Sequence, residues 1–144
     1  GIGDCGLGIG DWGLGIGDFL CERSDFYLPA ARLMVKSYNK EIELCCSTLT
    51  LATASYFMER SKVSQTDIFH KISDMISICE LADVDRDVVV QALSSGFTDF
   101  EDAMQYFSAK KWGADIIITR NKKDFANSQL PVYEPLEYLE LEND

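Results

Sequence analysis

Apolar and polar positions along this chain follow two patterns. The first is the i, i+3, i+4, i+7 spacing of an amphipathic helix, and the residues that show it best are Phe100, Ala103, Met104 and Phe107. The second is the unbroken β-branched run at 116–118, which is typical of a strand covered on both faces. The same patterns predict further helices at 29–39, 48–60, 64–78, 85–93 and 135–139, and further strands at 42–47, 79–82 and 130–133.

Helices and strands alternate in this prediction, which favours an α/β fold with a parallel sheet covered by helices on both faces. The 144 residues are 47% hydrophobic, which suits one domain with a normal core. No run reaches 18 apolar residues and the start does not resemble a signal peptide, so we expect no membrane span and a cytoplasmic location. The five cysteines are an odd number without Cys-x-x-Cys spacing, so we expect buried free thiols.

The stretch 97–125 carries the candidate chemistry. Asp99 stands where a helix N-cap is expected, and Asp102 is an acid in the first turn of that helix. Gly113 ends the helix, and the strand at 116–118 follows. Binding sites in open α/β sheets form at the carboxyl ends of strands. The polar residues that follow this strand are Thr119, Arg120, Asn121 and Asp124.

Carboxylates at a helix start and after a strand can converge on one divalent cation, and Mg²⁺ and Mn²⁺ prefer carboxylate oxygens and water. Five of the 13 basic residues fall between Lys110 and Lys123, where a phosphate backbone could run. The net charge of −11 argues against nucleic-acid binding by overall charge, but it leaves binding through this local basic cluster open.

Two segments of this stretch resemble a known family. They read Asp-Phe-Glu-Asp-Ala-Met-Gln-Tyr-Phe-Ser-Ala at 99–109 and Asp-Ile-Ile-Ile-Thr-Arg-Asn-Lys-Lys-Asp-Phe at 115–125. Both are similar to the C-terminal half of PIN domains, which are metal-dependent ribonucleases and include the toxins of toxin–antitoxin pairs. The resemblance extends from about Asp18 to Leu139. It implies a three-layer α/β/α fold with a central parallel sheet.

The resemblance also implies roles for individual residues and for partners. The catalytic carboxylates would be Asp102, Asp124 and Asp99, and the metal ligands Asp102, Asp124 and Asp11. Supporting positions would be Thr119, Asn121 and Thr53, and RNA contacts would be Arg120, Lys122 and Lys123. The implied cofactor is Mg²⁺ or Mn²⁺. The implied partners are an RNA substrate, an antitoxin protein and a second copy of the chain.

Residues 1–20 repeat with a period of seven and hold eight of the ten glycines. Glycine is costly to order, so we expect residues 1–17 to be flexible or loosely extended, ahead of a PIN-like domain at 18–140 and an acidic tail at 141–144. PIN domains begin with a strand that ends in Asp-Thr-Asn, and here the repeat stands in its place. By spacing, the missing aspartate falls near Trp12, so Asp11 can substitute for it. Thr53 holds the position where many PIN domains carry a glutamate.

Ordinary structural roles compete with these functional ones. Asp102 can be a first-turn acid, Asp99 a cap, Asp124 a turn residue, and Lys122 with Lys123 a solvated pair. Two functions therefore remain open: a PIN-like endoribonuclease that hydrolyses RNA phosphodiester bonds, and a degenerate PIN fold that binds a partner without catalysis. A nucleotide-binding domain built on the glycine repeat is set aside, because Gly-x-Gly-x-x-Gly needs a preceding strand.

Overall fold

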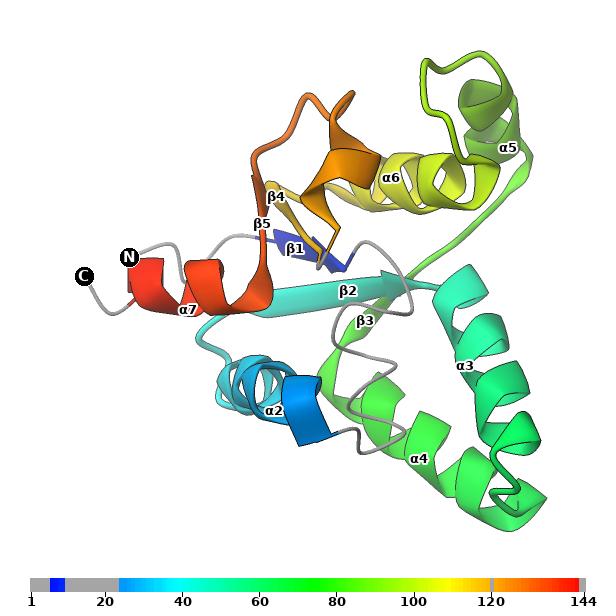
Figure 1. The fold of residues 1–144 in the computed structure, drawn as a ribbon, viewed down its shortest axis with the longest axis vertical. Coiled ribbons are helices and arrows are strands. Elements are labelled where there is room, and N and C mark those ends of the chain that lie inside the picture. The colour runs from blue at the N-terminus through cyan, green and yellow to red at the C-terminus, as the bar shows by residue number, and fades with distance from the viewer. Residues whose placement is uncertain (1–5, 10–23, 120, 143–144) are drawn as a thin grey trace.

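The computed structural model describes residues 6–9, 24–119 and 121–142. Its centre is a five-stranded sheet in the order β3-β2-β1-β4-β5, in which every neighbouring pair is parallel (Figure 1). The strands are β1 (Gly6–Ile9), β2 (Glu43–Ser47), β3 (Glu80–Ala82), β4 (Ile116–Ile118) and β5 (Val132–Tyr133). The predicted α/β fold with a central parallel sheet is confirmed.

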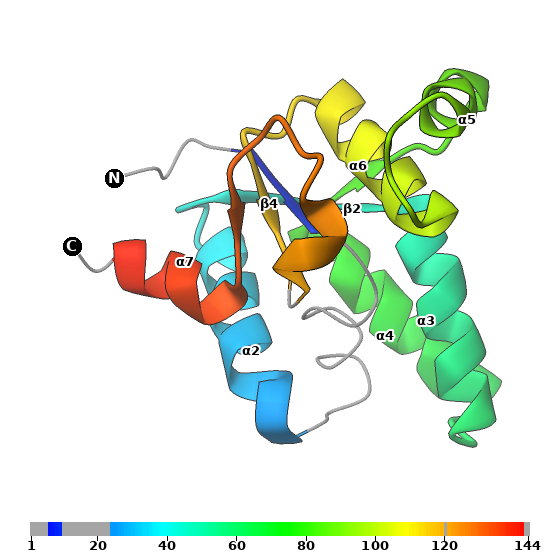
Figure 2. The ribbon, with the colours of Figure 1, turned by 45° about the horizontal axis from the view of Figure 1, so that its top comes forward.

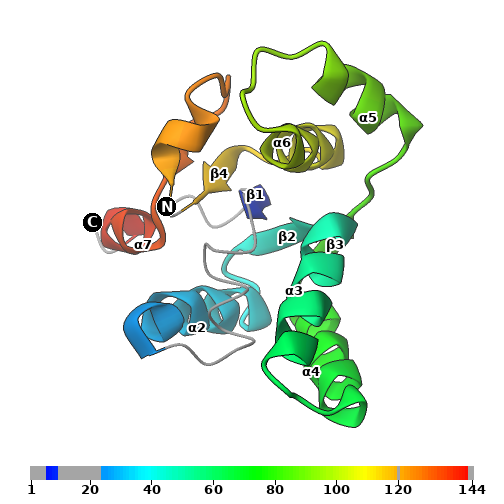
Figure 3. The ribbon, with the colours of Figure 1, turned by 45° about the vertical axis from the view of Figure 1, so that its right-hand side comes forward.

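Helices cover both faces of this sheet (Figures 2 and 3). They are α2 (Ser24–Tyr38), α3 (Thr48–Arg60), α4 (Gln65–Ile78), α5 (Arg86–Leu93), α6 (Phe100–Trp112) and α7 (Pro135–Glu142), with a 3₁₀ turn η2 at Lys122–Phe125. In Figure 3, α6 lies on one side of the strands, and α2 and α4 lie on the other. Within the described ranges, no helix is long and apolar enough to cross a membrane.

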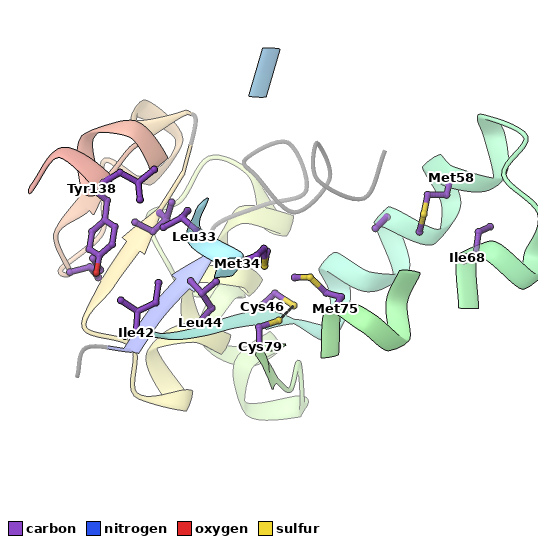
Figure 4. Close-up of a cluster of buried hydrophobic side chains, with 14 residues drawn as sticks. Leu33, Met34, Ile42, Leu44, Cys46, Met58, Ile68, Met75, Cys79 and Tyr138 are labelled. Atoms are coloured by element: carbon purple, nitrogen blue, oxygen red, sulfur yellow. Dashed lines mark hydrogen bonds between the residues drawn. The ribbon is translucent and has the colours of Figure 1, made fainter. Parts of the chain in front are cut away.

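Successive strand residues supply two separate hydrophobic cores, because side chains alternate across a strand. Leu44 and Ile116 belong to the core formed with α2, α3, α4 and α7 (Figure 4). Cys45 and Ile117 belong to the core under α6. Figure 4 shows Tyr138 of α7 near the beginning of β2, which closes the first core at that end. Both layers therefore depend on the same short strands.

Three of the five cysteines lie in these cores as free thiols: Cys45, Cys46 and Cys79. The Sγ atoms of Cys46 and Cys79 are 3.9 Å apart. Burial raises the pKa of Cys45 to about 12, so this thiol stays protonated and unreactive at neutral pH. The expectation of buried free thiols is confirmed for these three residues. Cys5 and Cys21 lie outside the described residues.

The central strand β1 comes from inside the glycine repeat, where we expected no strand. Gly8 is in register with Cys45 on one side and Ile117 on the other, so β1 has a parallel neighbour along both edges. Ordering glycine costs backbone conformational entropy. Hydrogen-bond ladders to β2 and β4 offset that cost, and they require only backbone groups. The first strand is therefore present at Gly6–Ile9. The rest of the segment expected to be flexible, residues 1–5 and 10–17, lies outside the described residues.

Most predicted helix starts are confirmed, with two corrections. The N-caps Ser64, Asp85 and Asp99 each accept a hydrogen bond from a backbone N–H of the first turn. From the sequence we expected Thr48 or Thr50 to cap α3, but the cap is Ser47, because the backbone N–H of Thr50 donates to the Ser47 hydroxyl. α2 begins at Ser24, so Pro29 lies inside the helix and not in its first turn. From the sequence we expected residues 19–27 to be the end and exit of an earlier helix, but residues 24–27 form the first turn of α2.

Gly113 is the clearest case of a glycine that the backbone requires. Its φ is +107°, and no atom lies within 4 Å of where a Cβ would stand. Gly113→Ala should therefore lower the free energy of unfolding by about 1–2 kcal/mol through backbone strain alone. Urea denaturation measures this loss. Gly113→Asn is the control and should lose less, because asparagine tolerates positive φ. Equal stability of all three proteins would contradict the assignment.

The placement of β1 makes a prediction for amide exchange. Residues 6–9 are paired on both edges, so their amides should exchange slowly, at rates close to those of β2. Hydrogen exchange followed by mass spectrometry of N-terminal peptides measures this directly. Exchange at 6–9 as fast as in an unfolded peptide would mean that the glycine repeat does not contribute the central strand.

Candidate functional site

The acidic residues of α6 lie at the carboxyl end of the sheet because of how the chain reverses at Gly113. Only Gly113, Ala114 and Asp115 connect α6 to β4, so the helix and the strand run in opposite directions. Thirteen helical residues span about 20 Å and three strand residues about 10 Å, so the first turn of α6 reaches past the end of β4. Figures 1 and 2 show this first turn toward the arrowhead of β2, where α3 begins.

Asp102 is the carboxylate that this arrangement buries. It is 8% exposed, although it occupies the first turn of α6, where acids are ordinarily solvated. Its backbone N–H donates to Oδ1 of Asp99 over 2.9 Å. Stabilising a helix start requires only a nearby acid and not its burial. The burial of Asp102 therefore favours a functional role over a purely structural one.

Asp99 is exposed and acts as the N-cap of α6, as predicted. One of its carboxylate oxygens is occupied by the backbone N–H of Asp102. The cap therefore fixes the backbone from which the Asp102 side chain projects.

Asp124 lies in η2, half-buried, on the segment that follows β4. An aromatic cluster holds this segment against α6. The ring of Phe97 lies 5.0 Å from that of Tyr106 and 6.1 Å from that of Phe125, centroid to centroid. The Tyr106 hydroxyl also accepts a hydrogen bond from the backbone N–H of Gln129 at 2.9 Å. These contacts fix the Asp124 segment and the α6 helix as one unit.

Among the described residues, no three His, Cys, Asp or Glu side chains come together as a set that could hold a metal ion. Asp99, Asp102 and Asp124 therefore do not form a complete ligand cluster by themselves. Asp11, the further ligand implied by the resemblance, lies outside the described residues, as does Arg120. In sequence, Asp11 comes two residues after β1, whose last residue is in register with Ile118.

Buried hydroxyl groups line the ends of β2 and β4. Thr119 is fully buried and its Oγ1 accepts a hydrogen bond from the backbone N–H of Asn121 at 3.2 Å, so it orders the loop after β4. At the end of β2, the buried hydroxyl groups of Ser47 and Thr50 lie with their oxygens 3.3 Å apart, a contact that we did not predict. Its only signal in the sequence is a serine between a buried strand and a helix. Thr53 is half-buried in the second turn of α3.

The predicted basic cluster is largely engaged in contacts within the protein. Lys122 forms an ion pair with Glu137 at 3.1 Å, and Lys111 forms one with Asp85 at 2.7 Å. The pKa of Glu137 is lowered, first by the backbone N–H of Glu134 and then by Lys122. Lys110 donates to the side chain of Gln129. Lys123 is exposed.

The loop-ordering bond of Thr119 can be tested separately from any metal site. Thr119→Val keeps the volume but removes the acceptor for the Asn121 N–H, and should cost about 1 kcal/mol of unfolding free energy. Thr119→Ser keeps the acceptor and is the control for the hydroxyl. Urea unfolding of both variants measures the difference. A Thr119→Val protein as stable as the original chain would show that this hydrogen bond does not order the loop.

Comparisons with known proteins agree with this architecture. A PIN domain family model matches residues 16–123. The chain is 27% identical over 105 residues to Ribonuclease VapC1 of Aquifex aeolicus (strain VF5), which covers 69% of this chain and 71% of that protein.

Two solved structures share the fold. One is VapC20 of Mycobacterium tuberculosis, described as a Sarcin-Ricin loop cleaving toxin, with a TM-score of 0.58, 14% identity, and coverage of 78% of this chain and 86% of that one. The other is VapBC2 of Rickettsia felis bound to a DNA fragment from their promoter, with a TM-score of 0.59, 16% identity, and coverage of 91% and 97%. Because the family model covers most of the sequence, this chain belongs to the PIN domain family.

Proposed function

We propose that this chain is a divalent-metal-dependent endoribonuclease that hydrolyses RNA phosphodiester bonds and is the toxin of a toxin–antitoxin pair. The observation that carries the proposal is the burial of the Asp102 carboxylate at the carboxyl end of a parallel sheet. Ligands of open α/β sheets bind outside the carboxyl ends of the strands, so an acid held at that end is placed to meet one. Membership of the PIN family and the similarity to Ribonuclease VapC1 support the reaction class.

The donor set fits a hard divalent cation. Asp102 and Asp124 come from the rigid unit of α6 and η2, and Asp11 follows the strand between β2 and β4 in the sheet order. Carboxylates with remaining sites filled by water are the ligands that Mg²⁺ and Mn²⁺ take. When bound, the ion supplies Lewis-acid chemistry that activates water and offsets charge on the phosphate.

The other predicted residues take supporting parts in this proposal. Asp99 positions Asp102 through the helix cap, and Thr119 and Asn121 order the loop that carries Asp124. Lys123 is exposed and is available for RNA phosphates. Lys122 would contact RNA only by giving up its ion pair with Glu137. Arg120, which precedes these lysines in the sequence, would be a third positive charge for RNA. Thr53, near the start of α3, would be a supporting residue of the site.

A protein partner is part of the same proposal, together with a cytoplasmic location. Several large apolar side chains remain exposed on the helices, and they include Tyr38, Phe69 and Leu93 at about 70% exposure. Apolar side chains scattered singly are ordinary on protein surfaces, so the support for a partner is the fold shared with VapBC2 of Rickettsia felis. An antitoxin or a second copy of the chain would fill this role.

A second candidate is a PIN fold that binds a partner without cleaving RNA. It is favoured by the incomplete acidic cluster among the described residues and by threonine at position 53. A threonine hydroxyl brings no charge to a cation. Such a site would hold Mn²⁺ weakly, so metal binding separates the two candidates.

The test is cleavage of a mixed RNA pool with Mn²⁺. Asp102→Asn and Asp124→Asn should each reduce the cleavage rate at least about 100-fold. Asp67→Asn is the matched control, because Asp67 lies three residues after its N-cap Ser64, as Asp102 does after Asp99, but is exposed. It should cleave like the original chain. Equal cleavage by all variants would refute these site assignments.

Stability supplies a second readout. Asp102→Asn should stabilise the metal-free protein, because it removes the repulsion between this carboxylate and the other acids of the proposed site. The original chain should gain thermal stability with Mn²⁺ through linkage, and Asp102→Asn should gain much less. Thermal unfolding with and without Mn²⁺ measures both effects. No cleavage by any form, together with no stabilisation by Mn²⁺, would establish the second candidate instead.

A further inference from the structure

Gln105 of α6 is buried without hydrogen-bond partners. Its side chain is 2% exposed, and neither its Oε1 nor its Nε2 has a partner. Across the part of the chain that the structure describes, it is the only buried side chain left in this condition. A buried amide without partners destabilises a fold, so such a group in a native structure indicates a bound water or ligand.

Its surroundings offer no protein partner. Gln105 is one turn along α6 from Asp102, and residues three apart lie on the same face of a helix. The core under α6 is formed by Cys45, Ala82, Tyr106, Ala109, Ala114, Ile117 and Phe125. The Tyr106 hydroxyl in this core is already bonded to Gln129. The backbone groups of the central strand are engaged in ladders on both edges.

β1, which packs against α6, has glycine at positions 6 and 8, and glycine adds no side chain to this region. Gly8 is in register with Cys45 and Ile117, which are strand residues of the core under α6. α6 packs directly against β1 and β2. Leucine or methionine would fill the position of Gln105 without leaving polar atoms unpaired. The amide is therefore explained by something that binds beside Asp102, and not by packing.

We propose that Gln105 is a positioning residue of the cation site, whose amide hydrogen-bonds the water shell of the divalent ion held by Asp102. This inference rests on the proposed function. Mg²⁺ and Mn²⁺ keep several waters when bound through one or two carboxylates. A glutamine oxygen accepts hydrogen bonds from such waters, and its NH₂ group donates to a carboxylate. Groups in this outer position ordinarily change metal affinity by 10- to 100-fold.

The experiment measures Mn²⁺ binding to the full chain without RNA, by calorimetry, and thermal unfolding with and without Mn²⁺. Gln105→Met should have a metal-free Tm at or above that of the original chain and bind Mn²⁺ about 10-fold more weakly. Gln105→Glu keeps an oxygen acceptor at this position, so this variant should bind Mn²⁺ at least as tightly as the original chain. Its metal-free Tm should fall, because a second carboxylate then lies beside Asp102. Gln91→Met is the control in α5, where the amide bonds Asp87 on the surface, and should leave Mn²⁺ binding unchanged.

The results that would overturn the inference also show whether the proposed function fails with it. If the original chain binds Mn²⁺ and Gln105→Met binds it equally well, Gln105 has no part in the site while the proposed function stands. The same holds if Gln105→Met loses stability and keeps its affinity. If the original chain shows no Mn²⁺ binding, the cation site of the proposed function fails, and the role of Gln105 fails with it.

Discussion

The reversal of the chain at Gly113 is the constraint on which the candidate site depends. A left-handed glycine ends α6, and three residues later the chain enters β4 in the opposite direction. This turn decides that the first turn of α6 and the loop after β4 lie at the same end of the sheet. Asp102 from the helix and Asp124 from the loop belong to segments that share this end because of it. A longer connection would leave the direction and height of α6 unspecified.

The aromatic cluster converts this topology into a rigid site. Phe97 precedes α6, Tyr106 lies within it, and Phe125 lies in η2, so three segments share one set of ring contacts. The same contacts hold Asp124, which is adjacent to Phe125. Rigid elements keep carboxylates in place before a cation binds, which lowers the free energy of ordering them on binding.

Local patterns in the sequence predicted the features that local interactions decide. The Ile116–Ile118 run, the Asp99 cap and the Gly113 stop depend on nearest neighbours, and the structure confirms each of them. β1 could not be predicted, because its stability comes from ladders with β2 and β4, which are distant in sequence. Propensity alone gives glycine the wrong state at that place.

Long-range contacts also decide which polar residues are available. The ion pair of Lys122 requires that α7 return beside η2, and nothing near Lys122 in the sequence indicates this. Gln105 shows the same effect, since it lies between apolar residues and only burial reveals its unpaired amide. The acids at 99, 102 and 124 could be selected from the family motifs. Which of them is buried could not.

Stability and function make opposite demands on α6. The buried residues of this helix are Ala103, Tyr106 and Ala109, but also the polar Asp102, Gln105 and Ser108. Of these, Gln105 has no hydrogen-bond partner, so an apolar residue at its position would cost less to bury. An amide left unpaired in this helix is explained most directly by the ligand that we propose beside Asp102.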